Sequence, residues 1–189
     1  YVVADLALAD GLGVAVVALA EPSGLRGDAG AVAARYLEHG GVVLSADGDW
    51  PEQPLVIVDA LFGTGLDRPL HGMAASLVRR ANASGHPVLA IDVPSGLNAD
   101  TGSAPGAAIR ARQTITYIAG KRGLWTGAAP GYTGRVTLDG LGLPDSVAAS
   151  ELPAATLLDP TGPARRLPPR PRDAHKGLSG HLLVVGGDH

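Results

Sequence analysis

Residues 55–69 have the sequence Leu55-Val56-Ile57-Val58-Asp59-Ala60-Leu61-Phe62-Gly63-Thr64-Gly65-Leu66-Asp67-Arg68-Pro69. The first four residues carry no charge and three of them are β-branched, which is typical of a strand buried on both faces of a parallel sheet. This strand ends on Asp59 and is followed by a glycine-rich loop. Because ligands bind beyond the carboxyl ends of strands in open α/β sheets, we expect Asp59 and the loop to lie at a ligand site.

The loop contains the run Gly63-Thr64-Gly65. Its two glycines allow the backbone to approach a ligand closely and to present N–H donors to a phosphate. The same run also occurs in ordinary tight turns. The loop by itself therefore leaves a phosphate site and a simple turn as alternatives.

A second stretch of the same kind has the sequence Val88-Leu89-Ala90-Ile91-Asp92-Val93-Pro94-Ser95-Gly96-Leu97-Asn98. It predicts another short apolar strand, which ends on Asp92 and opens into a turn with proline and glycine. Two strands that each carry a carboxylate at the carboxyl end predict that Asp59 and Asp92 share one crevice.

The composition is that of a globular domain. The chain has 189 residues, of which 46% are hydrophobic, enough for one domain with its own core. The net charge of −3 gives no basic surface for nucleic acid. The absence of cysteine excludes disulfides and agrees with a reducing, cytoplasmic location. No apolar run approaches membrane-spanning length, so no membrane partner is expected.

Apolar periodicity and glycine stops predict alternating helices and strands. This order favours an α/β fold, a Rossmann-like three-layer α/β/α sandwich around a mostly parallel sheet. The expected helices are residues 1–10, 28–39 and 72–84, and the expected strands are residues 14–19, 42–44, 55–59, 88–92, 113–118 and 136–141.

Several side chains of the helices have predicted surroundings. Asp28 is expected to cap the second helix, and Trp50 is expected to pack as a lid rather than to contact a ligand. Arg79, Arg80 and Asn82 are expected to face water. Buried helix faces are predicted at Val2, Val3, Leu6 and Ala9, at Val32, Ala33, Tyr36 and Leu37, and at Met73, Leu77, Val78 and Ala81.

The composition changes after Ser150. Residues 151–173 are rich in proline and arginine and predict an extended linker, so that residues 1–150 form the first domain. Residues 174–189 contain an apolar strand and a glycine turn, which predict the truncated start of a second domain. We therefore expect the chain to be an internal piece of a longer protein.

The motifs at the two strand ends resemble those of the YjeF N-terminal family, which contains the NAD(P)HX epimerases. The resemblance covers roughly residues 1–147 and depends on the two aspartate loops, their order and their spacing. Residues 174–187 resemble the opening of an ADP- or ATP-dependent NAD(P)HX dehydratase domain of ribokinase-like fold. The other matching motifs are Asp100-Thr101-Gly102, Gly134-Arg135-Val136, Leu141-Gly142-Leu143-Pro144 and His175-Lys176-Gly177.

This resemblance implies the repair of hydrated nicotinamide cofactors. The epimerase of the family interconverts the R and S forms of NADHX or NADPHX, and the dehydratase restores NAD(P)H from the S form with ADP or ATP and Mg²⁺. It therefore implies an isomerase fused to a lyase, with a hydrated dinucleotide as its small-molecule partner. Self-association into a homo-oligomer stays open.

The resemblance also implies roles for individual residues. Asp59 and Ser95 match potassium ligands, and their hard oxygens suit an alkali cation. Asp92 matches a substrate-contacting residue, and we predict that it is the catalytic acid or base, because epimerisation at a carbon that bears a hydroxyl needs proton transfer. The loop expected to bind the dinucleotide consists of Gly63, Thr64, Gly65, Leu66, Asp67, Arg68 and Pro69.

The residues themselves leave simpler roles open. Asp59, Asp92 and Ser95 are each able to cap a local turn. Lys121 and Arg122 are either phosphate ligands or a surface pair. A non-catalytic binding or scaffold module is the alternative function, and a generic dehydrogenase domain is a weaker one because the full G-x-G-x-x-G fingerprint is absent.

One departure from the family pattern affects the expected activity. In the family, a Gly-Asn-Asn-Gly-Gly-Asp-Gly loop with substrate contacts and another potassium ligand precedes the helix that residues 1–10 match. Here the chain starts after that loop. We therefore expect the chain alone not to epimerise, to bind potassium weakly or not at all, and not to bind ADP or ATP through residues 175–187.

Overall fold

The structure is a computed structural model that describes residues 1–51, 56–144, 146–147 and 151–158. It divides into two units, Tyr1–Leu152 and Pro153–His189. All the helices and strands given below belong to the first unit. The predicted start of a second domain and most of the predicted linker lie outside the described residues, as does Leu55.

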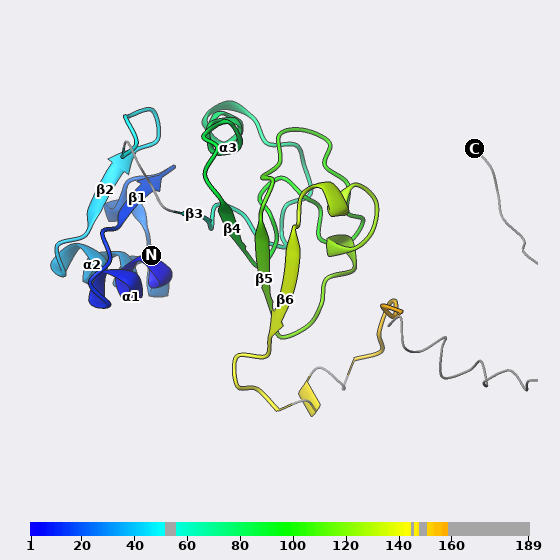
Figure 1. The fold of residues 1–189 in the computed structure, drawn as a ribbon. Coiled ribbons are helices and arrows are strands. Elements are labelled where there is room, and N and C mark those ends of the chain that lie inside the picture. Colours follow the sequence, from blue (N-terminus) through cyan, green and yellow to red (C-terminus); the bar gives the residue numbers. More distant parts are fainter. Residues whose placement is uncertain (52–55, 145, 148–150, 159–189) are drawn as a thin grey trace, which may run out of the picture. The chain divides into compact units, whose positions relative to one another are not determined.

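The helices and strands of the first unit follow one another in the order that the sequence predicts (Figure 1). Three short 3₁₀ turns, Pro22–Gly24, Arg122–Leu124 and Ala129–Gly131, lie between them. The main elements are α1 (Val2–Ala9), β1 (Ala15–Ala18), α2 (Gly27–Glu38), β2 (Val42–Ser45), β3 (Ile57–Asp59), α3 (Gly72–Ala83), β4 (Val88–Ile91), β5 (Gln113–Tyr117) and β6 (Arg135–Asp139).

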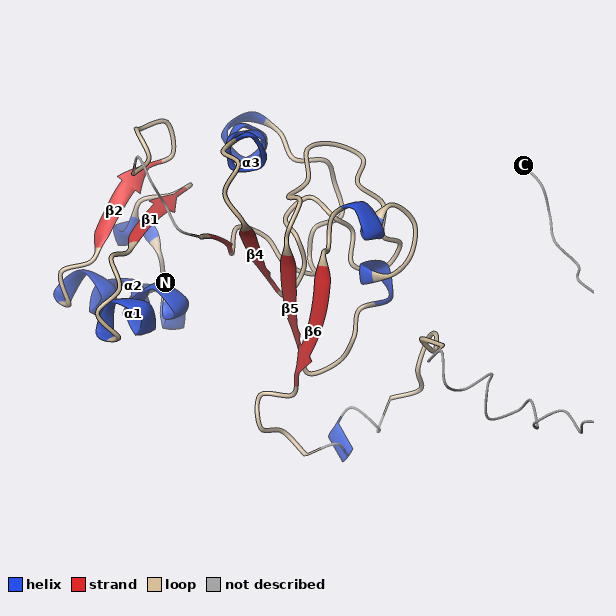
Figure 2. Ribbon diagram, viewed as in Figure 1, coloured by secondary structure: helices blue, strands red, loops and turns tan. Residues whose placement is uncertain are grey.

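Every described strand pair is parallel, which confirms the α/β, Rossmann-like class (Figure 2). The strands form two sheets in place of the single sheet expected: a pair β1-β2, and a four-stranded sheet in the order β3-β4-β5-β6. Since β3 and β4 are parallel neighbours, with Asp59 opposite Ala90, their carboxyl ends meet at one edge of the sheet. That edge carries both aspartate loops.

Helix α3 packs on the four-stranded sheet and supplies much of its hydrophobic core. Ala75, Val78 and Ala81 are buried against Val88 and Ile109. Leu77 is also buried, so most of the predicted stripe is confirmed, but Met73 is 44% exposed. Met73 lies in the first turn, at the margin of the buried stripe, which explains the difference.

Two side chains of α3 that were expected to face water also have hydrogen-bond partners, and of these Arg80 is partly buried whereas Asn82 is exposed as predicted. Arg80 donates to the carbonyl of Gly48 at 2.7 Å and lies over the ring of Trp50. Asn82 bonds to the backbone of Ala108 and Arg110. Trp50 packs against the α3 core as predicted. These contacts connect the helix to two loops.

The N-terminal helix is turned differently from the prediction. Val2, Val3 and Leu6 are 53%, 41% and 59% exposed, and the buried residue of α1 is Asp5. The carboxylate of Asp5 receives hydrogen bonds from Arg35 at 2.6 Å and His39 at 2.7 Å, both from the end of α2. A buried carboxylate needs such partners, so α1 packs on α2 through Asp5 rather than through its valines.

Helix α2 also departs from the prediction at its start. It begins at Gly27 after Arg26, so Asp28 lies in its first turn and is not the N-cap. There its charge still favours the positive end of the helix dipole. Ala33 and Tyr36 are buried as predicted, whereas Leu37 is 44% exposed.

We expect Asp5→Asn to lower the free energy of unfolding more at neutral pH than at acidic pH. Burial acts to raise the pKa of Asp5, but the hydrogen bonds from Arg35 and His39 outweigh it and the pKa is lowered from its ordinary value of 3.8. A lowered carboxyl pKa stabilises the fold above 3.8 and loses that contribution as the pH falls further. Urea unfolding of the full-length protein at pH 7 and near pH 3.5 measures the difference, with exposed Asp10→Asn as the control. An equal effect of Asp5→Asn at both pH values would contradict this prediction.

Candidate functional site

Asp59 ends strand β3 and is only 4% exposed. Its two carboxylate oxygens accept hydrogen bonds from one residue of the next aspartate loop. Ser95 donates its backbone N–H to Oδ2 at 2.8 Å and its hydroxyl to Oδ1 at 2.6 Å. The strand ends that the sequence placed side by side are thus joined by side-chain contact.

The turn after β4 fixes the direction of Ser95. Gly96 has φ +96°, and a Cβ there would lie 2.2 Å from the carbonyl oxygen of Ala107, so only glycine fits. The carbonyl of Ser95 accepts from the N–H of Ile109 at 2.8 Å. Ser95 itself is 1% exposed, and its hydroxyl has no freedom to turn to solvent.

The hydroxyl of Ser95 also reaches the beginning of the glycine loop. It accepts from the N–H of Phe62 at 3.0 Å and lies 3.3 Å from the carbonyl oxygen of Phe62. We call the carboxylate of Asp59, the hydroxyl of Ser95 and the carbonyl of Phe62 the oxygen cluster. Sequence reasoning missed the Phe62 carbonyl, because a backbone atom leaves no residue pattern.

The negative charge of the oxygen cluster is not balanced by a basic side chain of the described residues. Burial raises the pKa of Asp59, although hydrogen bonds from Ser95 and Leu61 act in the opposite direction. In the part of the chain that the structure describes, no Lys, Arg or His forms an ion pair with Asp59. A buried carboxylate without a basic partner is a place where a bound cation would be stabilised.

The donor set suits only certain cations. Carboxylate, hydroxyl and carbonyl oxygens are hard ligands of alkali and alkaline-earth ions. Among residues 1–51, 56–144, 146–147 and 151–158, no group of three or more His, Cys, Asp or Glu side chains is placed to hold a metal ion. Any cation bound here would therefore depend on the mixed donors of the oxygen cluster.

Asp92 follows β4 in an unusual backbone conformation, with φ +68°. Its N–H bonds to the carbonyl of Ile115 at 2.7 Å, which ties it to β5. Its Oδ1 accepts from Lys121 at 2.6 Å and from Thr116 at 3.2 Å. A non-glycine residue held in the left-handed region is typical of functional sites.

The other carboxylate oxygen of Asp92 faces the glycine loop. A Cβ built on Gly63 would lie 3.7 Å from Oδ2, the only atom within 4 Å of it among the described residues other than Gly63 and its two chain neighbours. Gly63 also lines a cavity of about 500 Å³. The predicted loop residues that line this cavity are Gly63, Gly65, Leu66, Asp67, Arg68 and Pro69.

Thr64 is the one residue of the predicted loop that is not among the lining residues of this cavity. The wall is completed by residues that the sequence did not single out as site residues: Leu61, Phe62, Leu70, His71 and Ala74. Asn98 donates to the carbonyl of Leu66 at 3.4 Å and links the loop to the second aspartate loop.

The structure also bears on the simpler alternative that Asp59, Asp92 and Ser95 each cap a local turn. Asp59 does accept from the N–H of Leu61, two residues on, at 3.4 Å, but its shorter bonds go to Ser95. The hydroxyl of Ser95 contacts β3 and its loop rather than its own turn. The carboxylate of Asp92 accepts from Thr116 in β5 and from Lys121, which follows β5. Tertiary contacts thus dominate at all three residues.

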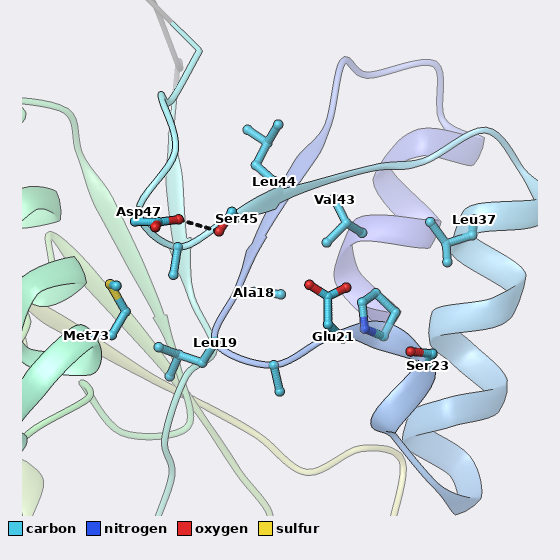
Figure 3. A pocket seen from close by; sticks show the side chains of 13 residues that line it. Ala18, Leu19, Glu21, Ser23, Leu37, Val43, Leu44, Ser45, Asp47 and Met73 are labelled. Carbon is cyan, nitrogen blue, oxygen red and sulfur yellow. Dashed lines mark hydrogen bonds between the residues drawn. The ribbon is translucent and has the colours of Figure 1, made fainter.

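A larger cavity, of about 640 Å³, lies at the carboxyl ends of β1 and β2 (Figure 3). Glu21, Ser23, Ser45 and Asp47 supply its polar side chains, and Ser45 donates a hydrogen bond to Asp47. None of the predicted site residues lines it. The candidate site is therefore the smaller cavity with the adjoining oxygen cluster and Asp92.

Known proteins resemble the chain along its whole length. The bifunctional NAD(P)H-hydrate repair enzyme Nnr of Vibrio cholerae is 41% identical over 188 residues, which are 100% of this chain and 38% of that protein. The enzyme of the same name from Escherichia coli is 41% identical over 189 residues, 100% of this chain and 36% of that protein. An NAD(P)H-hydrate epimerase of Limosilactobacillus fermentum is 47% identical over 81 residues, 43% of this chain and 39% of that protein.

The chain thus spans less than two fifths of the length of these curated relatives. The family model for the YjeF-related protein N-terminus matches residues 1–123, which include both aspartate loops and Lys121. The chain therefore belongs to the YjeF-related protein N-terminus family.

Proposed function

We propose that this chain carries the epimerase site of an NAD(P)H-hydrate repair enzyme, which interconverts the R and S forms of NADHX or NADPHX. The observation that carries the proposal is the carboxylate of Asp92, whose free oxygen faces a glycine loop beside a cavity. The names of the relatives, repair enzymes and an epimerase acting on NAD(P)H-hydrate, support the same substrate.

The dinucleotide binds along the loop of residues 63–69. This loop lines a cavity with both apolar and polar walls, and Arg68 offers a cation for a phosphate. Gly63 leaves space next to Asp92, since no side chain stands between them. The reacting ring of the substrate is thereby brought to Asp92.

Asp92 acts as the acid or base of the epimerisation. The reaction needs a proton to be moved while a bond at the hydroxyl-bearing carbon breaks and forms again. Oδ1 of Asp92 is occupied by Lys121 and Thr116, and Oδ2 accepts no hydrogen bond from any described residue. Oδ2 is therefore the oxygen that holds or takes the proton.

The oxygen cluster holds a potassium ion. Its three oxygen-bearing groups fit an alkali cation, and the buried carboxylate of Asp59 lacks a basic side-chain partner among the described residues. Asp59 and Ser95 would be its side-chain ligands. A bound cation there would place positive charge near the phosphates or the ring of the substrate.

The longer protein carries further functions. Residues 1–150 form the epimerase domain, residues 151–173 a linker, and residues 174–189 the start of a dehydratase domain that uses ADP or ATP with Mg²⁺. No helix in the described part of the chain combines the length and the apolar character needed to cross a membrane. The proposed location is the cytoplasm.

The scaffold alternative is not favoured. The relatives described above have enzyme names. Asp59 and Ser95 are held in direct contact, and Asp92 is held beside the same loop. A scaffold would not need this arrangement of carboxylates.

A direct assay of the full-length protein tests the proposal. The protein is incubated with R-enriched NADHX without ADP or ATP, so that a dehydratase cannot consume the S form, and the epimers are separated by chromatography. We expect the R to S ratio to reach equilibrium faster than without protein, and faster in potassium chloride than in tetramethylammonium chloride. Equal rates with and without protein would refute the epimerase function.

Gly63→Ala is expected to impair turnover without affecting stability. Gly63 does not have a positive φ, and its new methyl would lie 3.7 Å from Oδ2 of Asp92, in the space proposed for substrate. Misplacement of a substrate by about 1 Å costs about 100-fold in rate, so we expect a loss of that size in kcat/KM. The assay above measures the loss, and the melting temperature checks the fold. Gly131→Ala, also in open space, is the control, and a Gly63→Ala enzyme as fast as Gly131→Ala would contradict the prediction.

A further inference from the structure

Lys121 reaches Asp92 from the segment after β5. Its ammonium donates to Oδ1 of Asp92 at 2.6 Å and to the carbonyl of Tyr117 at 2.8 Å. The side chains of Lys121 and Asp92 are 21% and 25% exposed, so the ion pair is largely shielded from water. Ion pairs of this kind are stronger than pairs on the open surface.

The backbone between β5 and Lys121 is shaped to bring the lysine back to the sheet edge. Ile118 has φ +66°, and the N–H of Ala119 bonds to the carbonyl of Tyr117 at 2.7 Å, which makes a tight reversal. Lys121 then precedes the 3₁₀ turn Arg122–Leu124. The reversal turns the chain so that Lys121 faces the end of β4 rather than solvent.

The contacts of the Asp92 carboxylate are uneven. Lys121 and Thr116 both donate to Oδ1. Oδ2 receives no hydrogen bond from the residues that the structure describes, and it lies on the side of Gly63. The two donors therefore fix the rotation of the carboxylate and choose which oxygen is exposed to the loop.

We infer that Lys121 is a positioning residue of the epimerase, which holds Oδ1 of Asp92 so that Oδ2 is directed at the substrate. The inference rests on the proposed function, and it goes beyond the phosphate and surface roles open to Lys121 from the sequence. Thr116 contributes the second, neutral contact to the same oxygen.

Kinetics of the full-length protein with Lys121→Met test the inference. Because a misdirected general acid or base costs about 100-fold, we expect kcat for R to S conversion to fall by that factor, with KM within about threefold of the wild type. Lys121→Arg keeps a charged donor and is expected to recover at least a tenth of the wild-type kcat. If Lys121 were instead a ligand of a substrate phosphate, its loss would raise KM.

Two further variants sharpen the test. Arg79→Met removes an exposed cation of α3 and is the matched control, expected to leave kcat unchanged. In the Asp92→Asn background, Lys121→Met should cause no further loss of kcat, because there is no carboxylate left to direct. This double variant does not leave a partly buried carboxylate without its basic partner, so it keeps the test valid if Lys121→Met alone fails to fold.

The outcomes separate the inference from the proposed function. A wild-type protein that does not epimerise refutes the function itself. An active wild type whose Lys121→Met variant keeps more than half of kcat, or shows only a higher KM, overturns the positioning role alone. A further tenfold loss in the Asp92→Asn background also overturns it, because Lys121 would then act independently of Asp92.

Discussion

Asp92→Asn is expected to lower kcat for epimerisation by about 10²- to 10⁴-fold, the usual contribution of general acid–base catalysis. An amide neither takes up nor releases a proton at neutral pH, so Oδ2 would lose its role. KM should change little, because the loop of residues 63–69 makes the proposed contacts to the dinucleotide and is untouched. Initial rates of R to S conversion by the full-length protein measure the effect.

Asparagine is a fair test here because the fold accepts it. Asp92 lies at φ +68°, a region where asparagine is among the best tolerated residues. Its side-chain oxygen is able to keep the bonds from Lys121 and Thr116, which leaves the amide nitrogen toward Gly63. The melting temperature should therefore stay close to that of the wild type. Loss of activity would then be chemical rather than structural.

A matched control comes from the same loop. Asp100 is exposed and its carboxylate has no proposed role, so Asp100→Asn should retain wild-type kcat. Full activity of Asp92→Asn would remove Asp92 from the reaction. It would leave the cavity and the oxygen cluster as a binding site without a catalytic group.

Asp59→Ala is expected to have the largest effect on stability. It removes the acceptor of two donors of Ser95, which is 1% exposed, and each buried donor left unsatisfied costs about 1–3 kcal/mol. We expect the free energy of unfolding of the full-length protein to fall accordingly and potassium to have no remaining effect. Denaturant unfolding in potassium chloride and in tetramethylammonium chloride measures both.

Asp59→Asn separates the charge from the hydrogen bonds. Burial raises the pKa of Asp59, so the folded protein holds the proton more tightly than the unfolded chain. Without potassium, wild-type stability should therefore fall as the pH rises through the pKa of the folded state. Potassium should offset this loss, because it binds the ionised carboxylate. The Asn variant should lack both the pH-dependent loss and the response to potassium.

Ser95→Thr is the control, since it keeps a hydroxyl at the same position. Its response to potassium should persist even if the added methyl lowers stability. A potassium response of equal size in Asp59→Asn and in the wild type would show that the ion binds elsewhere in the longer protein.

The pairing of the two aspartate loops followed from the sequence, because short parallel strands bring their carboxyl ends to one edge. Asp59 and Asp92 end successive apolar strands, and β3 and β4 are indeed parallel neighbours. The contact between Asp59 and Ser95 was expected only through the family resemblance. It depends on the shape of the turn around Gly96, which sequence periodicity does not encode.

The role of Lys121 was open for a related reason. The ion pair with Asp92 requires left-handed backbone at both Asp92 and Ile118, two positions that the sequence predicts to lie at the ends of extended strands. The prediction of the buried face of helix α1 was wrong for a different reason. Its valines suggested a buried face, but Asp5, with Arg35 and His39 as partners, is the side chain that packs inward.

The bridge between Asp59 and Ser95 also determines how β3 aligns with its neighbour. Strand β3 has only three residues, and a ladder that short specifies its register weakly. A slip of one residue would turn the Asp59 side chain to the opposite face and leave Ser95 without an acceptor. The residues proposed to bind the cation thus also specify the register of β3 against β4. Mutations of these residues that weaken ion binding will therefore also allow β3 to pair out of register during folding.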